Sequence, residues 1–297
     1  MIIIPGPASQ ILGIRIANLK VADIIQVKFK EFPDGEHYIK IENGDKVKNQ
    51  DVIIIQSTYS PQNDNLMELL MILDGVKNLK PSSIMLIVPY LCYSRQDKRF
   101  LEGEPLTAEI VCKIIEEIGD PLLNKFLTID IHSEKILDYF SQKIEVKNLS
   151  AMPLFGEYFK NLGLKDPCVI APDEGALKRS KIVADFINAD CNYLSKKRDL
   201  NTGKISIDMK NLSIKGRDVI FTDDIISTGG TMASAIKMAK NQGANDIYAV
   251  CTHPLLIRDA KYRIFHAGAK EIIATDCIPS ECSKISVAPL IAEFLTK

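Results

Sequence analysis

The chain has 297 residues, of which 46% are hydrophobic, and this predicts a globular protein with two cores of ordinary size rather than a disordered one. Its 37 basic and 38 acidic residues give a formal net charge of -1, which argues against nucleic acid as a partner. No apolar run approaches the ~18 residues that cross a bilayer, so we expect no membrane association and a cytoplasmic location. The seven cysteines show no C-x-x-C pairing, which predicts buried free thiols rather than disulfides or a zinc site.

Short runs rich in β-branched residues alternate with helical patterns along the whole chain. This alternation is typical of parallel α/β sheets with helices on both faces, and it predicts a doubly wound fold. The expected strands are 52–56, 84–90, 126–131, 168–172, 219–224, 247–253 and 271–276. The expected helices, where apolar residues recur at i, i+3 and i+4, are 66–79, 108–119 and 231–243.

A weak internal repeat favours two related domains in tandem. Residues 51–90 can be laid over residues 218–253 as strand, loop, helix, turn and strand. The loops differ, because the first copy has QSTYSPQND where the second has TDDIISTGG. Two unrelated βαβ units with similar hydrophobicity would give the same pattern, so this alternative stays open.

Two polar motifs follow strand-like segments in the first domain. FPDGE, at 32–36, predicts a turn that would expose Asp34 and Glu36 beside the ring of Phe32. RQDKR, at 95–99, is a cationic loop suited to phosphate oxygens, although a solvated run of charges explains it equally well.

Two further motifs contain possible metal ligands at strand ends. His132 stands in DIHS, where it could coordinate a metal, although a lone histidine at a strand end is more often structural. In APDEGALKR, at 171–179, Asp173 could hold a metal while the backbone of Gly175 approaches an anion. The alternative is a turn in which the aspartate caps the next helix.

The segment TDDIISTGGT, at 222–231, is the most informative. A strand is expected to end at two carboxylates, Asp223 and Asp224, and a loop rich in glycine and hydroxyl groups then leads into a helix near Thr231. Glycines let the backbone approach an anion, and the free N–H groups of the helix point toward it. Phosphate would repel the carboxylates, so they suit sugar hydroxyls or hydrated magnesium. The combination predicts a site for a phosphorylated sugar.

These motifs, in this order, resemble those of the ribose-phosphate diphosphokinases, and the resemblance covers essentially the whole chain. It implies two tandem domains of the type I phosphoribosyltransferase-like fold, at 1–147 and 148–282, with 283–297 packing on the first. It also implies transfer of a diphosphoryl group from ATP to ribose 5-phosphate, with Mg2+, in a homo-oligomer that is at least a dimer.

The resemblance assigns roles to individual residues. SKKRDLNTGK, at 195–204, is by itself an exposed loop, but it matches the family's catalytic loop. Catalysis falls to Lys196 and Arg198, with Lys197 as the alternative lysine, and Mg2+ to His132 and Asp173. Together with the ring of Phe32, the residues assigned to ATP are Asp34, Gly35, Glu36, Arg95 and Gln96. The residues that the pattern and the resemblance assign to ribose 5-phosphate are Arg198, Asp223, Asp224, Ser227, Thr228, Gly229, Gly230 and Thr231.

Two departures from the family pattern and two rival functions remain. Ala176 stands where a second glycine is usual, and Ser227 stands where an aspartate is usual. A phosphoribosyltransferase that consumes phosphoribosyl diphosphate would explain TDDIISTGGT but not FPDGE or RQDKR. A non-catalytic regulatory homologue is the other rival, and the intact Lys196, Arg198 and His132 argue against it.

Overall fold

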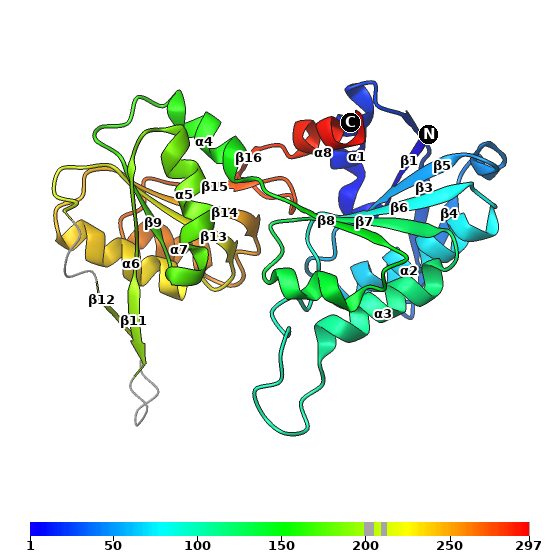
Figure 1. Cartoon of the computed structure of the whole chain (residues 1–297), viewed down its shortest axis with the longest axis horizontal. Coiled ribbons are helices and arrows are strands. Elements are labelled where there is room, and N and C mark those ends of the chain that lie inside the picture. The colour runs from blue at the N-terminus through cyan, green and yellow to red at the C-terminus, as the bar shows by residue number, and fades with distance from the viewer. Residues whose placement is uncertain (199–204, 209–212, 297) are drawn as a thin grey trace. The chain divides into compact units, whose positions relative to one another are not determined.

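The structure is a computed structural model, and it describes residues 1–198, 205–208 and 213–296 (Figure 1). It divides into two compact units. Unit 1 comprises Met1–Leu149 and Ser286–Lys297, and unit 2 comprises Ser150–Ile285. Among the described residues, no helix combines the length and the apolar character that a membrane span requires.

Unit 1 is built on a parallel sheet of six strands. In spatial order the strands are β2 (Asp23–Ile24), β1 (Ile2–Pro5), β5 (Asp51–Ile55), β6 (Ser83–Val88), β7 (Leu123–Ile129) and β8 (Glu145–Leu149). Its helices are η1 (Pro7–Ser9), α1 (Gln10–Asn18), η2 (Gly44–Val47), α2 (Gln62–Asn78), α3 (Thr107–Gly119), η3 (Glu134–Tyr139) and α8 (Ala288–Thr296).

Both faces of this sheet are buried. Along β5, Val52 and Ile54 join the apolar cluster that α2 and α3 cover, while Ile53 and Ile55 point to the opposite face and are also buried. Figure 1 shows α1 and α8 on the side of the sheet away from α2 and α3. A strand buried on both faces must be apolar throughout, which explains why β5 reads as a continuous aliphatic run.

Unit 2 repeats the same strand order. In spatial order its parallel strands are β10 (Asp190–Tyr193), β9 (Cys168–Ala171), β13 (Val219–Ile226), β14 (Ile247–Pro254), β15 (Glu271–Thr275) and β16 (Ser283–Ile285). Its helices are α4 (Met152–Lys160), η4 (Glu174–Ala176), α5 (Leu177–Phe186), α6 (Gly230–Asn241) and α7 (Ala260–His266). The predicted fold class, two tandem doubly wound parallel sheets, is confirmed.

Each unit also carries an antiparallel hairpin. In unit 1, β3 (Val27–Glu31) pairs with β4 (His37–Ile41), and the predicted turn at 32–36 joins them. In unit 2, β11 (Ser195–Arg198) pairs with β12 (Ile205–Asp208). The prediction of a loop from residue 195 onward was therefore wrong for its first four residues, because the run SKKR lacks the apolar alternation that signals a strand. Residues 199–204 lie outside the described part of the chain.

All seven predicted strands are present, with small differences at their ends. The most important difference is in β13, which continues to Ile226 instead of ending at Asp224. The strands that the periodicity missed are either short or polar and lie mostly at sheet edges. They are β1, β2, β4, β8, β10, β11, β12 and β16.

Candidate functional site

The loop between β13 and α6 forms a backbone cradle at the carboxyl edge of the unit 2 sheet. Gly229 caps α6 with left-handed backbone angles of φ 71° and ψ 2°. The segment that leads to α7 holds this loop, since the Leu256 amide donates to the Ile226 carbonyl (2.9 Å) and the Ile257 amide to the Ser227 carbonyl (3.2 Å). The amides of the first turn of α6 have no partner within the helix, so they favour an anion here.

The hydroxyl groups of the same loop are further hydrogen-bond donors beside those amides. Thr228 and Thr231 are exposed, and Ser227 and Gly230 are partly exposed. The predicted residues of the phosphate loop are therefore brought together around one helix terminus. Ser227, which replaces the usual aspartate, contributes a hydroxyl donor instead of a negative charge.

We predict that Gly229→Ala lowers the free energy of unfolding. A residue with a side chain costs ~1–2 kcal/mol in the left-handed region. In addition, a Cβ at this position would lie 3.2 Å from the Ala260 carbonyl oxygen on α7. Denaturant unfolding measures the loss. Gly230→Ala is the matched control, because its nearest new contact is the Thr228 hydroxyl at 3.9 Å and its φ is not positive. Equal stability of the two variants would contradict the structural role of Gly229.

The two adjacent aspartates of β13 have different surroundings. Asp224 is 4% exposed, and its carboxylate lies 3.8 Å from the guanidinium of Arg179 on α5. Asp223 is partly exposed, and its carboxylate accepts a hydrogen bond from the Asp224 amide (2.9 Å). The prediction that both carboxylates stand at the strand end was wrong, because the strand continues past them, and neighbouring strand residues point to opposite faces.

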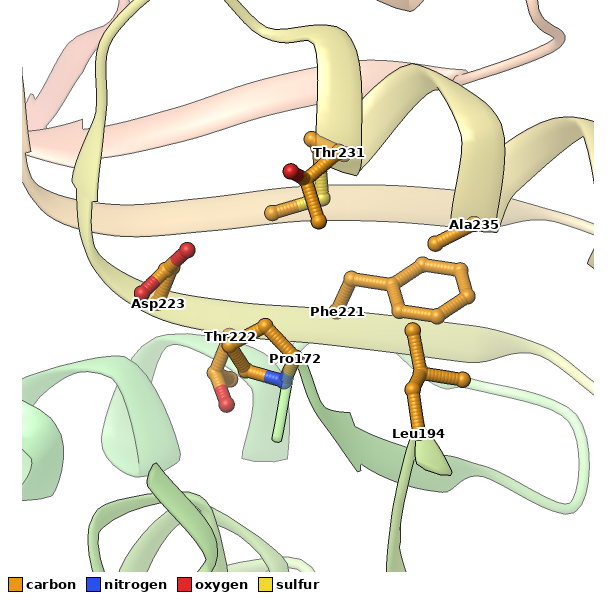
Figure 2. Close-up of a pocket in the computed structure, with 8 residues that line it drawn as sticks. Pro172, Leu194, Phe221, Thr222, Asp223, Thr231 and Ala235 are labelled. Atoms are coloured by element: carbon orange, nitrogen blue, oxygen red, sulfur yellow. The ribbon is translucent and has the colours of Figure 1, made fainter. Parts of the chain in front are cut away.

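Asp223 faces a small pocket of about 10 Å³, which is room for about one water molecule. Figure 2 shows its carboxylate and the Thr231 side chain on the same side of β13. Burial raises the pKa of Asp223 well above its ordinary value, and the carboxylates of Asp224 and Asp173 raise it further. This accumulation of negative charge is unfavourable unless a proton, a cation or a hydroxyl donor enters the site.

The loop after β9 lies at the same edge of the sheet. Asp173 caps η4, since its carboxylate accepts a hydrogen bond from the Ala176 amide (3.1 Å). Ala176 is buried, and its carbonyl accepts a hydrogen bond from the Ser180 hydroxyl (3.1 Å). That hydroxyl also lies 2.5 Å from the Thr222 hydroxyl on β13. The Ser180 hydroxyl therefore connects the loop after β9 to strand β13 at Thr222, the residue before Asp223.

Sequence reasoning missed Ser180, Thr222 and Arg179 as supports of this site. Ser180 lies four residues after Ala176, the helical spacing at which a serine hydroxyl reaches a backbone carbonyl. The sequence alone could therefore have indicated this one hydrogen bond. The contacts that join α5 to β13 span more than 40 residues, and no local pattern reveals them.

The acidic residues of unit 2 fit a magnesium ion that also keeps water and substrate phosphates as ligands. Within the described ranges, no group of three or more His, Cys, Asp or Glu residues forms a ready-made metal site. Magnesium, however, usually keeps several waters and binds one or two carboxylates together with substrate phosphates. Asp173 has a carboxylate of that kind, and the charge of Asp223, which interacts with it, would also favour a cation. In unit 1, His132 is exposed just after β7, beside the buried Asp130, which has a positive φ of 41°.

The turn at 32–36 presents its side chains to solvent. The Phe32 amide donates to the Glu36 carbonyl (2.7 Å), and the Gly35 amide donates to the Phe32 carbonyl (2.9 Å). Asp34, Gly35 and Glu36 are exposed, and Gly35 has a φ of 88° with open space where a Cβ would stand. The ring of Phe32 is 38% exposed and carries the Lys30 ammonium at 4.6 Å from its centre. The predicted turn is confirmed, and its ring and carboxylates are available to a ligand.

Arg95 and Gln96 lie in the exposed segment between β6 and α3. The side-chain oxygen of Gln96 accepts a hydrogen bond from the Thr107 hydroxyl (2.6 Å), which fixes it against the start of α3. In the part of unit 1 that the structure describes, no hydrogen bond or ion pair joins either residue to the turn at 32–36. Contacts within this unit therefore do not bring the two predicted nucleotide motifs together.

The loop after β5 corresponds to the cradle of unit 2 in the internal repeat, but its polar groups bond to the protein itself. Gln56, Ser57 and Thr58 are fully buried. The Ser57 amide donates to the Ser9 hydroxyl (2.8 Å), and the Thr58 hydroxyl donates to the Tyr90 carbonyl (2.9 Å). The first three residues of this loop therefore have their polar groups bonded within the protein, unlike the exposed hydroxyls of Thr228 and Thr231 in unit 2.

The backbone of Lys196 and Arg198 belongs to β11, opposite Ile207 and Ile205 of β12. The side chains of this hairpin lie outside the described part of the structure. The catalytic roles predicted for the two residues are therefore carried forward as proposals.

Comparison with known proteins gives a consistent result over the full length. Residues 1–119 match the family model described as the N-terminal domain of ribose phosphate pyrophosphokinase. Residues 205–292 match the phosphoribosyl synthetase-associated domain. A ribose-phosphate pyrophosphokinase of Methanosarcina mazei is 42% identical over 294 residues, covering 99% of this chain and 95% of that protein.

Other relatives agree with this match. The ribose-phosphate pyrophosphokinase of Sulfurisphaera tokodaii is 40% identical, covering 98% of this chain and 99% of that protein. Among solved structures, phosphoribosylpyrophosphate synthetase from Mycobacterium smegmatis has a TM-score of 0.86 at 27% identity and covers 99% of this chain and 97% of that one.

Proposed function

The chain belongs to the ribose-phosphate pyrophosphokinase family, also called ribose-phosphate diphosphokinase, and from this membership we propose the role of each site residue. The enzyme transfers the diphosphoryl group of ATP to the anomeric hydroxyl of ribose 5-phosphate, giving phosphoribosyl diphosphate and AMP. The full-length similarity to relatives of this name carries the assignment. The anion cradle of unit 2 supports it independently.

Unit 2 provides the site for ribose 5-phosphate. The phosphate would lie against Ser227–Thr231, with the amides of α6 and the hydroxyls of Thr228 and Thr231 as donors. Asp223 faces the same pocket as Thr231 and would accept hydrogen bonds from the ribose hydroxyls. The Asp224 amide, which donates to the Asp223 carboxylate (2.9 Å), would hold it in place, while the Asp224 carboxylate, paired with Arg179, is proposed for the same sugar.

Unit 1 provides residues for ATP. The Phe32 ring and the Asp34 and Glu36 carboxylates suit the adenine and ribose, because they are exposed and rich in acceptors. The exposed Arg95 and the neighbouring Gln96 suit phosphate oxygens. The backbone of Gly35 allows the tight turn that presents these groups.

Two magnesium sites would be built, one on Asp173 of unit 2 and one on His132 of unit 1, as proposed from the family resemblance. The ions would neutralise phosphate charge and orient the transferred group. The carboxylate of Asp173 is already fixed by the Ala176 amide, so it is oriented before a ligand arrives.

The chemical step forms a bond between the anomeric oxygen and the β-phosphorus and breaks the bond from that phosphorus to the oxygen of AMP. The proton of the anomeric hydroxyl leaves to solvent or to a nearby base. Lys196 and Arg198 would neutralise the transferring and leaving oxygens, which is the main requirement of phosphoryl transfer.

We also propose a homo-oligomer, at least a dimer, in the cytoplasm. Unit 1 exposes several large apolar side chains, a composition that favours burial against another chain. They are Ile11, Ile14, Met67, Ile110 and Ile114. All seven cysteines are free thiols, as in proteins of a reducing compartment.

Incubation with ATP, magnesium and ribose 5-phosphate tests the activity, with adenine nucleotides and phosphorus species followed together. We expect AMP and phosphoribosyl diphosphate in equal amounts, and none when either the sugar phosphate or the magnesium is left out. ADP as the main product would contradict diphosphoryl transfer. Turnover only with phosphoribosyl diphosphate and a nucleobase would indicate the phosphoribosyltransferase alternative, and ATP binding without turnover would indicate a regulatory homologue.

A further inference from the structure

The β3–β4 hairpin depends on the rest of unit 1 for its orientation. A two-stranded hairpin is marginally stable by itself, and these two strands are not part of the six-stranded sheet. On β4, Ile39 and Ile41 point inward and pack against the apolar core, while Tyr38 and Lys40 are exposed. Apolar packing has little directional preference, so it holds the hairpin in place without fixing the direction of its turn.

A directional contact occurs at the turn end of the hairpin. His37 pairs with Glu31 in the last register position before the turn at 32–36. Its Nδ1 atom lies 3.0 Å from Oε1 of Glu68 on α2, and the side chains are 14% and 5% exposed. The His37 ring also packs edge-on against Phe29, with centres 4.9 Å apart. This side chain therefore connects the base of the turn to a helix of the core.

Glu68 is itself held rigidly. Its second oxygen, Oε2, accepts a hydrogen bond from Nε2 of Gln56 at the end of β5 (3.1 Å). The side-chain oxygen of Gln56 accepts one from the Ala8 amide (3.1 Å), and Nε2 also donates to the Asn65 carbonyl (3.3 Å). Burial raises the pKa of Glu68, while His37 and Gln56 act in the opposite direction. A carboxylate in this position is costly unless both of its oxygens are bonded, as they are here.

We propose that His37 and Glu68 are a positioning pair that fixes the turn at 32–36 in the orientation that ATP binding requires. This inference rests on the proposed ATP role of the turn. Neither residue touches the nucleotide in this proposal. The hydrogen bonds run from Ala8 through Gln56 and Glu68 to His37, so they join the carboxyl edge of the unit 1 sheet to the base of the turn.

His37→Phe is the decisive variant, because it keeps a ring against Phe29 and removes the donor to Glu68. We expect ATP to bind about tenfold more weakly, the effect of losing one hydrogen bond to a charged group. Calorimetry with ATP alone measures the affinity, and steady-state kinetics should show the same rise in KM for ATP, with KM for ribose 5-phosphate and kcat within about twofold. Thermal unfolding checks that the variant is folded.

Two further variants separate positioning from general packing. His37→Asn keeps a donor near the Nδ1 position, so we expect it to restore most of the ATP affinity. Lys40→Gln lies on the same strand but on its exposed face, where Lys40 pairs with Glu42 (3.3 Å), and should leave ATP affinity unchanged.

Unchanged ATP affinity in His37→Phe, or an equal rise in both KM values, would overturn the positioning role. Failure of the proposed function looks different. In that case the wild-type chain itself would give no AMP with ribose 5-phosphate, while the calorimetric comparison of ATP affinities would still decide the role of His37.

Discussion

Lys196→Ala is expected to lower kcat by about a thousandfold while the affinity for ATP changes little. A cation that acts on the charge developing in the transition state is worth ~10²–10⁵ in rate, whereas the ground-state phosphates have other proposed partners, Arg95 and magnesium. The backbone supports a joint role with Arg198, because residues two apart on β11 share a face of the strand. Formation of AMP in the presence of ribose 5-phosphate measures the rate, and calorimetry measures the affinity.

Lys197→Ala is the matched control for this prediction. It removes the same charge at the adjacent position of β11, opposite Ser206, and should keep most of the activity. A large loss in Lys197→Ala with normal activity in Lys196→Ala would transfer the role to the neighbouring lysine. Normal turnover in both variants would remove the catalytic role from this strand.

Asp223→Asn is expected to inactivate the enzyme and at the same time stabilise it. The amide keeps an oxygen that can accept from the Asp224 amide (2.9 Å in the parent), but it carries no charge. Burial and the carboxylates of Asp224 and Asp173 raise the pKa of Asp223, so its ionised form is disfavoured in the folded state. Removing this charge should raise Tm by ~2–4 °C for each kcal/mol gained in the free energy of unfolding. Activity should fall because the variant loses the negative charge and one of the two carboxylate oxygens proposed to accept from the ribose hydroxyls.

The pH dependence provides a second test. An aspartate titrates near pH 4 when unfolded, and the pKa of Asp223 is higher when folded. The folded state then binds more protons between these two values, so this residue's contribution to stability decreases as pH rises through that window. The difference in Tm between Asp223→Asn and wild type should therefore grow from pH 4 upward, in the absence of magnesium. Asp185→Asn, on the exposed face of α5, is the control. A pH-independent difference would contradict the raised pKa.

The buried part of the fold was predictable from the sequence, because a strand covered on both faces must be apolar along its whole length. The runs VIII at 52–55 and VIF at 219–221 have this character, and both lie in buried strands. Edge strands such as β10, with its sequence DCNY, are half solvated and carry no such pattern. The hairpin β11–β12 was missed for the same reason, since SKKR has charges where alternation would be needed.

The sequence predicted which loops form the candidate site, but not which side chains contact one another there. The glycines of 222–231 indicated the cradle, and the left-handed angles of Gly229 explain why one of them is required. The separate environments of Asp223 and Asp224 depend on Arg179, which lies 45 positions earlier by sequence numbering and reaches Asp224 only through the packing of α5. The contact between His37 and Glu68 likewise depends on how a hairpin packs on a helix, which no local pattern encodes.

The loop that follows β5 in unit 1 differs in chemistry from the corresponding loop of unit 2. The two units share one strand order, and the segment around Gln56 occupies the place that Asp223 occupies in the other unit. Its amides and hydroxyls already have partners, including Ser9 and Tyr90, so a sugar phosphate would have to break those bonds before it gained any. At these positions the two units therefore share a backbone arrangement but differ in the polar groups that remain unbonded.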